Sequence, residues 1–368
     1  MAATHSEAPT PDDAARERRL GLESSLRQNL WHKVRRGLAL WRTGEVPLRR
    51  VVNAGLCHLS LRWRHSRVLG KPFFLMIEPT NVCNLRCPLC PTGRGTLDRK
   101  PASMPLDMYK RVIDELRPYL IEVNISLMGE PLLHKDLPEM IAYAKGAKAR
   151  VVIPSNGHFL TEEASRQLVE SGLDGIYISF DGIDQETYER YRVRGDLQKV
   201  AEGVRTLLAQ RRALGRTNPF VELQFLVMKH NETQIDAFRA LADETGVDRR
   251  VIKPVSFNVA DWDDADTRET FEGFFPSCEE NRVYRRVHGA LTWKINQLAL
   301  CTSAWRSITV LADGSILPCC RDIRGHYTMG NVADGVLKVW NNERFRAFRR
   351  DMIRRRSEMP ICKVCPGE

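Results

Sequence analysis

Three cysteines stand close together in the stretch CNLRCPLC, at positions 83, 87 and 90. Thiolates are common ligands of zinc and of iron–sulfur clusters, and both kinds of centre usually take four protein ligands. No fourth cysteine, and no histidine at ligand spacing, lies near this triplet. Cys83, Cys87 and Cys90 therefore indicate a metal centre with one open position, where a small molecule can bind.

A second group of cysteines lies near the end of the sequence. Cys301, Gly314 and Cys319 follow the spacing C-x12-G-x4-C, and Cys362 and Cys365 form a C-x2-C pair. Four thiolates can hold a second 4Fe–4S cluster with every iron ligated, or a zinc ribbon-like site. We expect only one of Cys319 and Cys320 to reach such a centre, because neighbouring residues on an extended strand point to opposite faces.

Composition and charge limit where the protein works. The chain of 368 residues has a net charge of +10 and 28% charged residues, as expected of a globular protein with an anionic partner. The N-terminal stretch MAATHSEAPTPDDAARERR has no apolar core, so no signal peptide is expected. We expect a cytoplasmic protein, peripheral to the inner membrane face if its basic N-terminus binds lipid, in which ten cysteines favour metal binding over disulfides.

Strand and helix patterns alternate through the middle of the chain. Apolar strand candidates lie at 73–79, 121–128, 149–155, 175–180, 221–228 and 250–257. Helical patterns lie between and after them at 105–118, 136–146, 161–171, 196–213 and 231–245. Such alternation predicts right-handed βαβ units with a parallel sheet, and six units suit a partial barrel. The stretch SITVLADGSILPCC predicts a hairpin that turns at Asp313-Gly314.

The cysteine triplet and its preceding strand resemble the signature of the radical S-adenosylmethionine (radical SAM) superfamily. There, a C-x3-C-x2-C loop directly follows the first strand of a partial (β/α)6 barrel; here Cys83, Cys87 and Cys90 follow FFLMIEPTNV. The resemblance implies a 4Fe–4S cluster whose open iron binds the amino and carboxylate groups of S-adenosylmethionine (SAM). Reduction of that cluster would cleave SAM to a 5′-deoxyadenosyl radical, which abstracts a substrate hydrogen atom.

Segments after the next strands resemble the superfamily's SAM-binding positions. MGEP resembles a Gly-Gly-Glu motif with Met128 in place of the first glycine, and SNG resembles a Thr-Asn-Gly turn. The resemblance implies SAM contacts for Gly129, Glu130, Ser155, Asn156, Ser179, Asp181 and Arg192, with Arg192 pairing with the SAM carboxylate. Barrel active sites are built at the carboxyl ends of strands, where these residues are expected. Taken alone, each polar residue could equally be a turn or cap residue.

The C-terminal cysteines resemble the SPASM or twitch module of the same superfamily, with Cys301, Cys319, Cys362 and Cys365 as implied ligands of one auxiliary cluster. A full SPASM module has further cysteines, which this sequence lacks up to Glu368, so the single-cluster twitch condition is expected. The expected domains are a disordered segment 1–15, a basic amphipathic helical extension 16–72, the partial barrel 73–260, a connecting region 261–300 and the auxiliary module 301–368.

The basic segments suggest further partners. Leu30 to Trp41 form an apolar helical stripe opposite arginines and lysine, and we expect it either to clamp onto the main domain or to contact a membrane surface. Arg349, Arg350 and the run 354–356 are expected on the solvated face of a helix. Nucleic acid is disfavoured, because these basic runs lack interleaved aromatic residues.

The resemblance implies hydrogen-atom abstraction but several substrates remain open. We expect oxidation or epimerisation of a carbohydrate-like small molecule, with Cys320 as a candidate hydrogen donor and a flavodoxin or ferredoxin as the reducing partner. Alternatives are an enzyme that modifies a peptide or a lipid-linked substrate. A further alternative, of a different class, is a non-enzymatic protein that binds zinc or nucleic acid.

Overall fold

The structure is a computed structural model that describes residues 47–256, 265–287, 290–294, 301–362 and 365, with only the backbone described for 287 and 290–293. The chain divides into two compact units, Met1–Val52 and Asn53–Glu368, and the second contains every cysteine. The expected disordered segment 1–15 and the expected helix from Leu30 to Trp41 lie outside the described residues. None of the helices in the described ranges is long and apolar enough to cross a bilayer.

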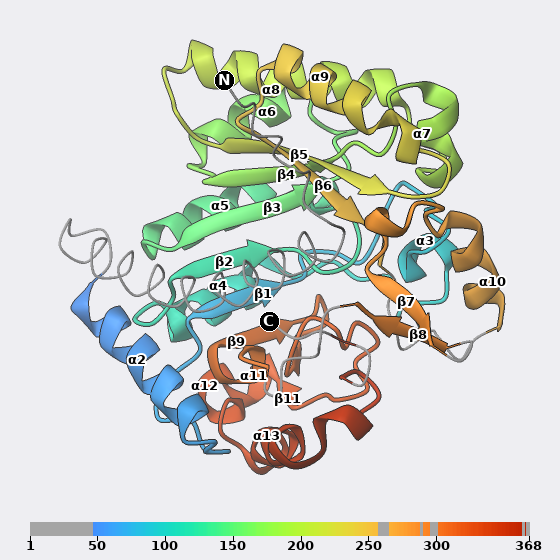
Figure 1. Ribbon diagram of the computed structural model, residues 1–368. Coiled ribbons are helices and arrows are strands. Elements are labelled where there is room, and N and C mark those ends of the chain that lie inside the picture. Colours follow the sequence, from blue (N-terminus) through green and yellow to red (C-terminus); the bar gives the residue numbers. More distant parts are fainter. Residues whose placement is uncertain (1–46, 257–264, 288–289, 295–300, 363–364, 366–368) are drawn as a thin grey trace, which may run out of the picture. The chain divides into compact units, whose positions relative to one another are not determined.

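A sheet of nine strands, in the order β11-β10-β9-β1-β2-β3-β4-β5-β6, runs through the second unit (Figure 1). Its six successive parallel strands are β1 (Phe74–Ile77), β2 (Glu122–Ile125), β3 (Arg150–Ser155), β4 (Gly175–Ser179), β5 (Phe220–Val227) and β6 (Arg249–Pro254). All six lie where the sequence predicts strands, and the predicted partial barrel is confirmed.

Helices follow the strands in the predicted order. They are α4 (Leu106–Leu116), α5 (Leu137–Gly146), α6 (Glu162–Glu170), α7 (Gln185–Tyr191), α8 (Leu197–Ala213) and α9 (Ile235–Thr245). Thr161, Asp184 and Asp196 cap the starts of α6, α7 and α8, because their side chains accept a backbone N–H of the first turn. Of these six helices, only α7 was not predicted from the sequence.

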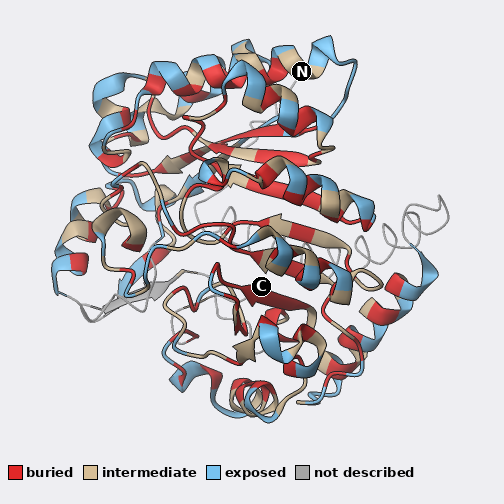
Figure 2. Ribbon diagram, turned by 180° about the vertical axis from the view of Figure 1, so that it is seen from behind, coloured by how far each residue is buried: buried red, intermediate tan, exposed pale blue. Residues whose placement is uncertain are grey.

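The two faces of the parallel sheet differ in chemistry. Partners in register share a face, and one face carries buried apolar residues such as Val123, Ile176 and Leu223, which belong to the same hydrophobic core as the helices. The opposite face carries Asn124, Tyr177, Gln224 and similar polar residues. In Figure 2 most of the strands are coloured as buried or intermediate along their length. The helices thus cover one face, and the polar face lines the inside of the partial barrel.

The C-terminal segment continues the same sheet. Strand β9 (Ser307–Val310) pairs in parallel with β1, and β10 (Ser315–Leu317) returns antiparallel to β9. The predicted hairpin is confirmed, and Gly314 adopts a φ of 84° at its turn, a conformation that favours glycine. The remaining elements are α11 (Ser303–Arg306), β11 (Gly330–Asn331), η5 (Val332–Asp334), α12 (Val336–Val339), α13 (Glu343–Arg355) and η6 (Arg356–Glu358).

The connecting region contains more structure than the sequence indicates. It holds α10 (Ala265–Phe274), η4 (Glu279–Asn281) and a two-stranded sheet of β7 (Tyr284–Val287) and β8 (Ala290–Trp293). Short elements elsewhere are α3 (Pro91–Arg94), η1 (Pro131–Leu133) and η2 (Glu232–Gln234). Phe271, Phe275 and Tyr284 pack together as buried aromatic side chains. Tertiary packing of these rings, which local periodicity does not reveal, orders the region.

Two of the basic residues expected on a solvated helix face are buried instead: Arg356, which is 6% exposed, and Arg349. Arg349 is 0% exposed, and its guanidinium donates hydrogen bonds to the carbonyls of Ser66, Ala304 and Trp340. The guanidinium also stacks over the Trp340 ring, at 4.3 Å from its centroid. The prediction for Arg349 was therefore wrong, because a planar group with five donors can satisfy carbonyls inside a core.

A buried ion pair joins the barrel to the C-terminal segment. Glu78, directly after β1, is 0% exposed and accepts two hydrogen bonds from Arg99, at 2.8 and 2.7 Å. Glu78 also accepts the N–H of Ala312, while Arg99 donates its Nε to the carbonyl of Ile323. Breaking a buried pair by removing one partner leaves an uncompensated charge in the protein interior.

We expect the substitution Arg99→Met to destabilise the fold by about 3–5 kcal/mol, because the Glu78 carboxylate would stay buried without its cation. The apparent melting temperature, measured by circular dichroism, should fall by several degrees. Arg117→Met is the matched control, since Arg117 and its partner Asp114 are 42% and 52% exposed and such surface pairs contribute little. Equal melting temperatures for the two variants would contradict the role given to the buried pair.

Candidate functional site

The loop after β1 brings Cys83, Cys87 and Cys90 into one cluster of apolar side chains. Burial raises the pKa of the Cys87 thiol to about 11 and also raises the pKa of Cys83, with a further increase from the neighbouring thiols. Helix α3 packs directly against this loop at Gly93, where a Cβ atom would stand 2.6 Å from the backbone nitrogen of Cys87. Gly93 is not among the site residues predicted from the sequence. Its contact with Cys87 explains why a glycine stands just after the triplet.

Gly129 packs against the segment that leads from β1 into Cys83. A Cβ atom at this position would stand 2.4 Å from the carbonyl oxygen of Thr80, and its φ of 77° also favours glycine. The N–H of the next residue, Glu130, donates to the carbonyl of Val82 at 2.9 Å. The end of β2 is thereby fixed against the cysteine loop, which explains why glycine is needed here.

The Glu130 carboxylate holds the turn that follows β3. It is 2% exposed and accepts hydrogen bonds from the Ser155 hydroxyl at 2.8 Å, the Asn156 N–H at 2.7 Å and the Leu132 N–H at 3.1 Å. Burial raises the pKa of Glu130, and these donors only partly oppose the increase. Glu130 and Ser155 therefore organise the site through bonds within the chain.

Asn156 connects this turn to the cysteine loop. Its side-chain amide donates to the Asn84 side chain at 2.8 Å, and Asn84 directly follows Cys83. Two residues after Asn156, His158 is 5% exposed, and its Nε2 accepts the N–H of Asp196, the N-cap of α8. Burial lowers the pKa of His158, which favours the neutral ring that can accept this bond. Sequence analysis missed Asn84 and His158, since neither belongs to the motifs it used.

Arg192 lies between Asp181 and the cysteine triplet. Its Nε donates to the Asp181 carboxylate at 2.6 Å, and its Nη1 lies 3.7 Å from the sulfur of Cys87. Burial alone would lower the pKa of Arg192, but Asp181 and Cys87 raise it well above the usual value. The other Asp181 oxygen accepts the N–H of Leu226, and Ser179 ends β4 beside Gln224 of β5. A fixed cation therefore faces the three thiols.

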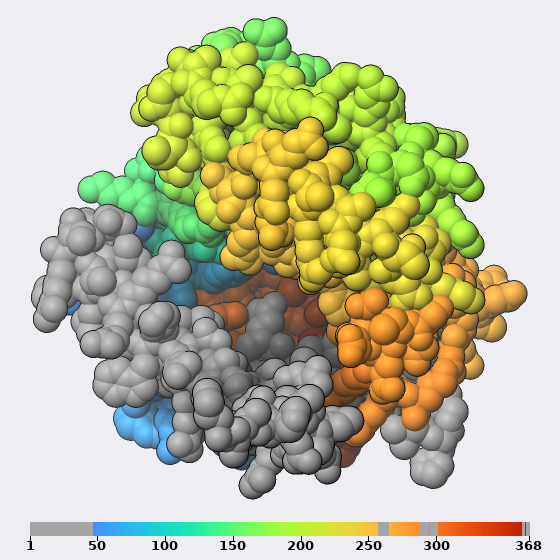
Figure 3. Space-filling view, turned by 45° about the horizontal axis from the view of Figure 1, so that its top comes forward, coloured from blue at the N-terminus to red at the C-terminus, as the bar shows by residue number. Residues whose placement is uncertain are grey.

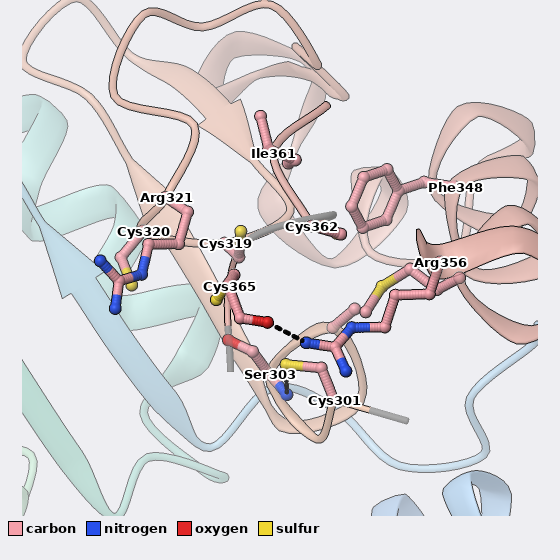
Figure 4. A pocket seen from close by; sticks show the side chains of 12 residues that line it. Cys301, Ser303, Cys319, Cys320, Arg321, Phe348, Arg356, Ile361, Cys362 and Cys365 are labelled. Atoms are coloured by element: carbon pink, nitrogen blue, oxygen red, sulfur yellow. Dashed lines mark hydrogen bonds between the residues drawn. The ribbon is translucent and has the colours of Figure 1, made fainter. Parts of the chain in front are cut away.

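The second group of cysteines lines one cavity (Figure 4). Cys301, Cys319, Cys362 and Cys365 come together there from segments far apart in the sequence, beside the apolar residues Phe348, Met352 and Ile361. Arg321 and Arg356 also line the cavity, and Arg356 donates to the carbonyl of Cys365 at 2.9 Å. Burial raises the pKa of the Cys362 thiol to about 12. A set of four thiols with nearby cations fits an anionic iron–sulfur cluster.

Cys320 also lines this cavity, but its side chain lies to one side, next to Arg321 and apart from Cys301 and Cys362 (Figure 4). Cys57 is 1% exposed and Cys278 is exposed, each away from both groups of thiols. Within the described ranges, no three histidine, cysteine or acidic side chains are spaced to hold a metal ion. The numbers of thiols in the two sets, three and four, are those expected of an iron–sulfur cluster with one open iron and of a fully ligated one.

Comparison with known families agrees with this arrangement. The profile of the radical SAM superfamily matches residues 77–217, and the profile of SPASM, an iron–sulfur cluster-binding domain, matches residues 301–366. The first range contains the cysteine triplet, Glu130, Asn156 and Arg192, and the second contains all four cysteines of the cavity.

Curated relatives carry several different names. The chain is 24% identical over 318 residues to the tungsten-containing aldehyde ferredoxin oxidoreductase cofactor-modifying protein of Pyrococcus furiosus, covering 79% of this chain and 86% of that protein. It is 26% identical over 291 residues to the mycofactocin maturase MftC of Mycobacterium tuberculosis, covering 75% and 72%.

Among solved structures, Streptococcus suis SuiB bound to S-adenosylmethionine superposes with a TM-score of 0.60 at 17% identity, covering 95% of this chain and 84% of that one. This likeness supports the fold. The two domains imply SAM with its 4Fe–4S cluster and an auxiliary 4Fe–4S cluster. The chain belongs to the radical SAM superfamily and is a radical SAM enzyme with a C-terminal SPASM domain.

Proposed function

We propose that this enzyme abstracts a hydrogen atom from a carbohydrate-like small molecule, bound on the polar inner face of the barrel, and thereby oxidises or epimerises it. The observation that carries the proposal is the thiol triplet next to a fixed network of Asn156, Asp181 and Arg192. When bound, the reduced cluster and SAM supply a 5′-deoxyadenosyl radical. The chain's own residues must therefore hold SAM, orient the substrate and exclude other reactants.

Each residue implied by the resemblance receives a role that its surroundings support. Cys83, Cys87 and Cys90 would ligate the SAM-binding cluster. Arg192, already beside Cys87, would also pair with the SAM carboxylate, while the backbone at Gly129 and Glu130 would accept the SAM amino group. Ser155 and Asn156 would hold the turn under SAM, Ser179 would contact SAM, and Asp181 would fix Arg192 for its contact with SAM. The expected barrel 73–260 and module 301–368 contain these two sets of residues.

The inner face of the sheet favours a hydroxyl-rich substrate. Asn124, Tyr177, Ser179 and Gln224 all lie on this face, and each can both donate and accept hydrogen bonds. Figure 3 shows a hollow bounded by the segment around β6 and by the segment from α10 to β7. The same face also carries charged side chains, such as Glu222 and Lys253. A polar lining of this kind matches hydroxyl groups better than it matches a long apolar chain.

A peptide substrate is the second candidate. The names of two relatives support a peptide substrate. The chain is 26% identical to the mycofactocin maturase MftC and 26% identical to a PqqA peptide cyclase of Granulibacter bethesdensis. The only support for a lipid-linked substrate is the basic N-terminal segment. Flavodoxin or ferredoxin is proposed as the electron donor for either substrate.

The two substrate classes separate in one experiment. The reconstituted enzyme, SAM and a reductant are incubated with a cell extract that has been split by ultrafiltration into small molecules and macromolecules. If the proposal is right, only the small-molecule fraction will raise 5′-deoxyadenosine formation above the level without substrate. Stimulation by the macromolecular fraction, lost after protease treatment, would establish the peptide instead.

We predict about eight iron per chain after anaerobic reconstitution, because three and four thiols fit two 4Fe–4S clusters. Replacing Cys83, Cys87 and Cys90 together by alanine should leave about four iron and abolish SAM cleavage. Cys278→Ala is the control, since this exposed cysteine lies outside both sites and its loss should change neither value. Formation of 5′-deoxyadenosine by the triple variant would refute the assignment.

The auxiliary cluster should distinguish the two neighbouring cysteines. We expect Cys319→Ala to lose the auxiliary cluster and Cys320→Ala to keep about eight iron, because the Cys320 side chain lies apart from the other thiols. Iron analysis and electron paramagnetic resonance provide the readout. If Cys320 returns a hydrogen atom during epimerisation, its variant will cleave SAM without completing the product. Loss of the second cluster in Cys320→Ala would reverse the ligand assignment.

Arg192→Met should raise the KM for SAM by about 10-fold or more, because a hydrogen bond between charged groups typically contributes about 1.5–3 kcal/mol. Arg192→Lys keeps the charge and should recover part of the loss. Iron content should stay unchanged in both variants, and Arg190→Met, two residues earlier in α7, serves as the exposed control. An unchanged KM would show that Arg192 acts only on Asp181 and the cluster loop.

A further inference from the structure

Three large apolar side chains are exposed near the end of α2 and just after it. Trp63 is 56% exposed, Leu69 is 51% exposed and Leu56 is 37% exposed. Leu56 and Trp63 are seven residues apart, so they lie on the same side of the helix and the turn that continues it. Single exposed apolar residues are common on protein surfaces, but a group of this kind indicates an interaction site.

The same segment is strongly basic. No aspartate or glutamate occurs from Val46 to Ile77, whereas Arg62, Arg64 and Arg67 lie between the exposed apolar residues. Within the described part of the chain, these three arginines form no ion pair. Their charges are therefore available to a partner.

Helix α13 adds cations to this segment from far along the sequence. Arg64, His65, Arg67 and Leu69 line one groove together with Arg350, Ile353 and Arg354 of α13. Arg350 pairs with Glu343, but Arg354 forms no ion pair among the described residues. In Figure 1 the end of α2 and α13 lie along the same edge of the second unit. Leu56, Trp63 and Leu69 with Arg62, Arg64, Arg67 and Arg354 form what we name the basic-apolar face.

We propose that the basic-apolar face docks on an anionic phospholipid bilayer. A tryptophan and leucines surrounded by arginines match the headgroup region, where apolar side chains insert at the acyl boundary and cations meet lipid phosphates. Nucleic acid fits less well, because aliphatic side chains such as Leu56 and Leu69 offer no surface on which bases stack. This inference goes beyond the reaction, since it concerns where the enzyme meets its surroundings.

The test is flotation of the full-length holoenzyme with vesicles of phosphatidylcholine, with or without phosphatidylglycerol. We expect binding only when phosphatidylglycerol is present, and weaker binding at high salt because charges on both partners are screened. Replacing Arg64, Arg67 and Arg354 by glutamine should weaken binding about a hundredfold, at about fivefold per arginine. Replacing Trp63 and Leu69 by serine should weaken binding at high salt as well, because the contribution of apolar side chains to binding is not screened by salt.

Matched controls remove the same groups from another part of the surface. Gln substitutions at Arg205, Arg212 and Arg216, which are exposed on α8 and just after it, remove three charges. Ser substitutions at Leu214 and Phe220 remove two apolar groups that are 36% and 37% exposed. Both controls should bind vesicles like the wild type. Absence of wild-type binding, equal loss in the controls, or displacement from vesicles by a short oligonucleotide would each overturn the proposal.

Discussion

The buried ion pair of Glu78 and Arg99 is the constraint on which the arrangement of the two cysteine groups depends. Glu78 precedes the loop that carries Cys83, Cys87 and Cys90, and Arg99 follows it, so the pair closes this loop at its base. A carboxylate that is 0% exposed is tolerated only if its hydrogen bonds are satisfied. Here two bonds from Arg99 and one from the N–H of Ala312 meet that requirement.

The same ion pair is also bonded to the C-terminal module. Arg99 donates to the carbonyl of Ile323, and Arg324 donates to the carbonyl of Thr96 at 2.6 Å. Ile323 and Arg324 follow shortly after Cys319 and Cys320, so the segments after both groups of cysteines are bonded to each other. The parallel pairing of β9 with β1 also joins the C-terminal module to the barrel. The two iron–sulfur sites are consequently parts of one continuous packed structure.

Hydrogen bonds at the strand ends differ from those on the inner face of the barrel. At the carboxyl ends of the strands, Glu130 is bonded to Asn156, and Asp181 is bonded to Arg192. Asn156 reaches the residue after Cys83, and Arg192 reaches Cys87, so both sets of bonds hold the region of the three thiols in place. On the inner face, by contrast, the Gln224 side chain donates to the neighbouring Glu222, outside that network.

Sequence alone determined the features that depend on local pattern or on chemistry. Strand and helix order followed from hydrophobic periodicity, and the hairpin at Asp313-Gly314 followed from its turn residues. The spacing of cysteines and the motifs after the strands led to the superfamily and to the cofactors, since only a few ligand sets produce such patterns. Tertiary structure decided what depends on partners far apart in the chain. The sequence of its helix predicts that Arg349 lies on the surface. In the structure its guanidinium is buried, because it donates hydrogen bonds to the carbonyls of Ser66 and Ala304. Asn84, His158 and the pair of Glu78 and Arg99 likewise acquire their roles only when separate strand ends meet, because their hydrogen-bond partners are set by packing and not by neighbours in sequence.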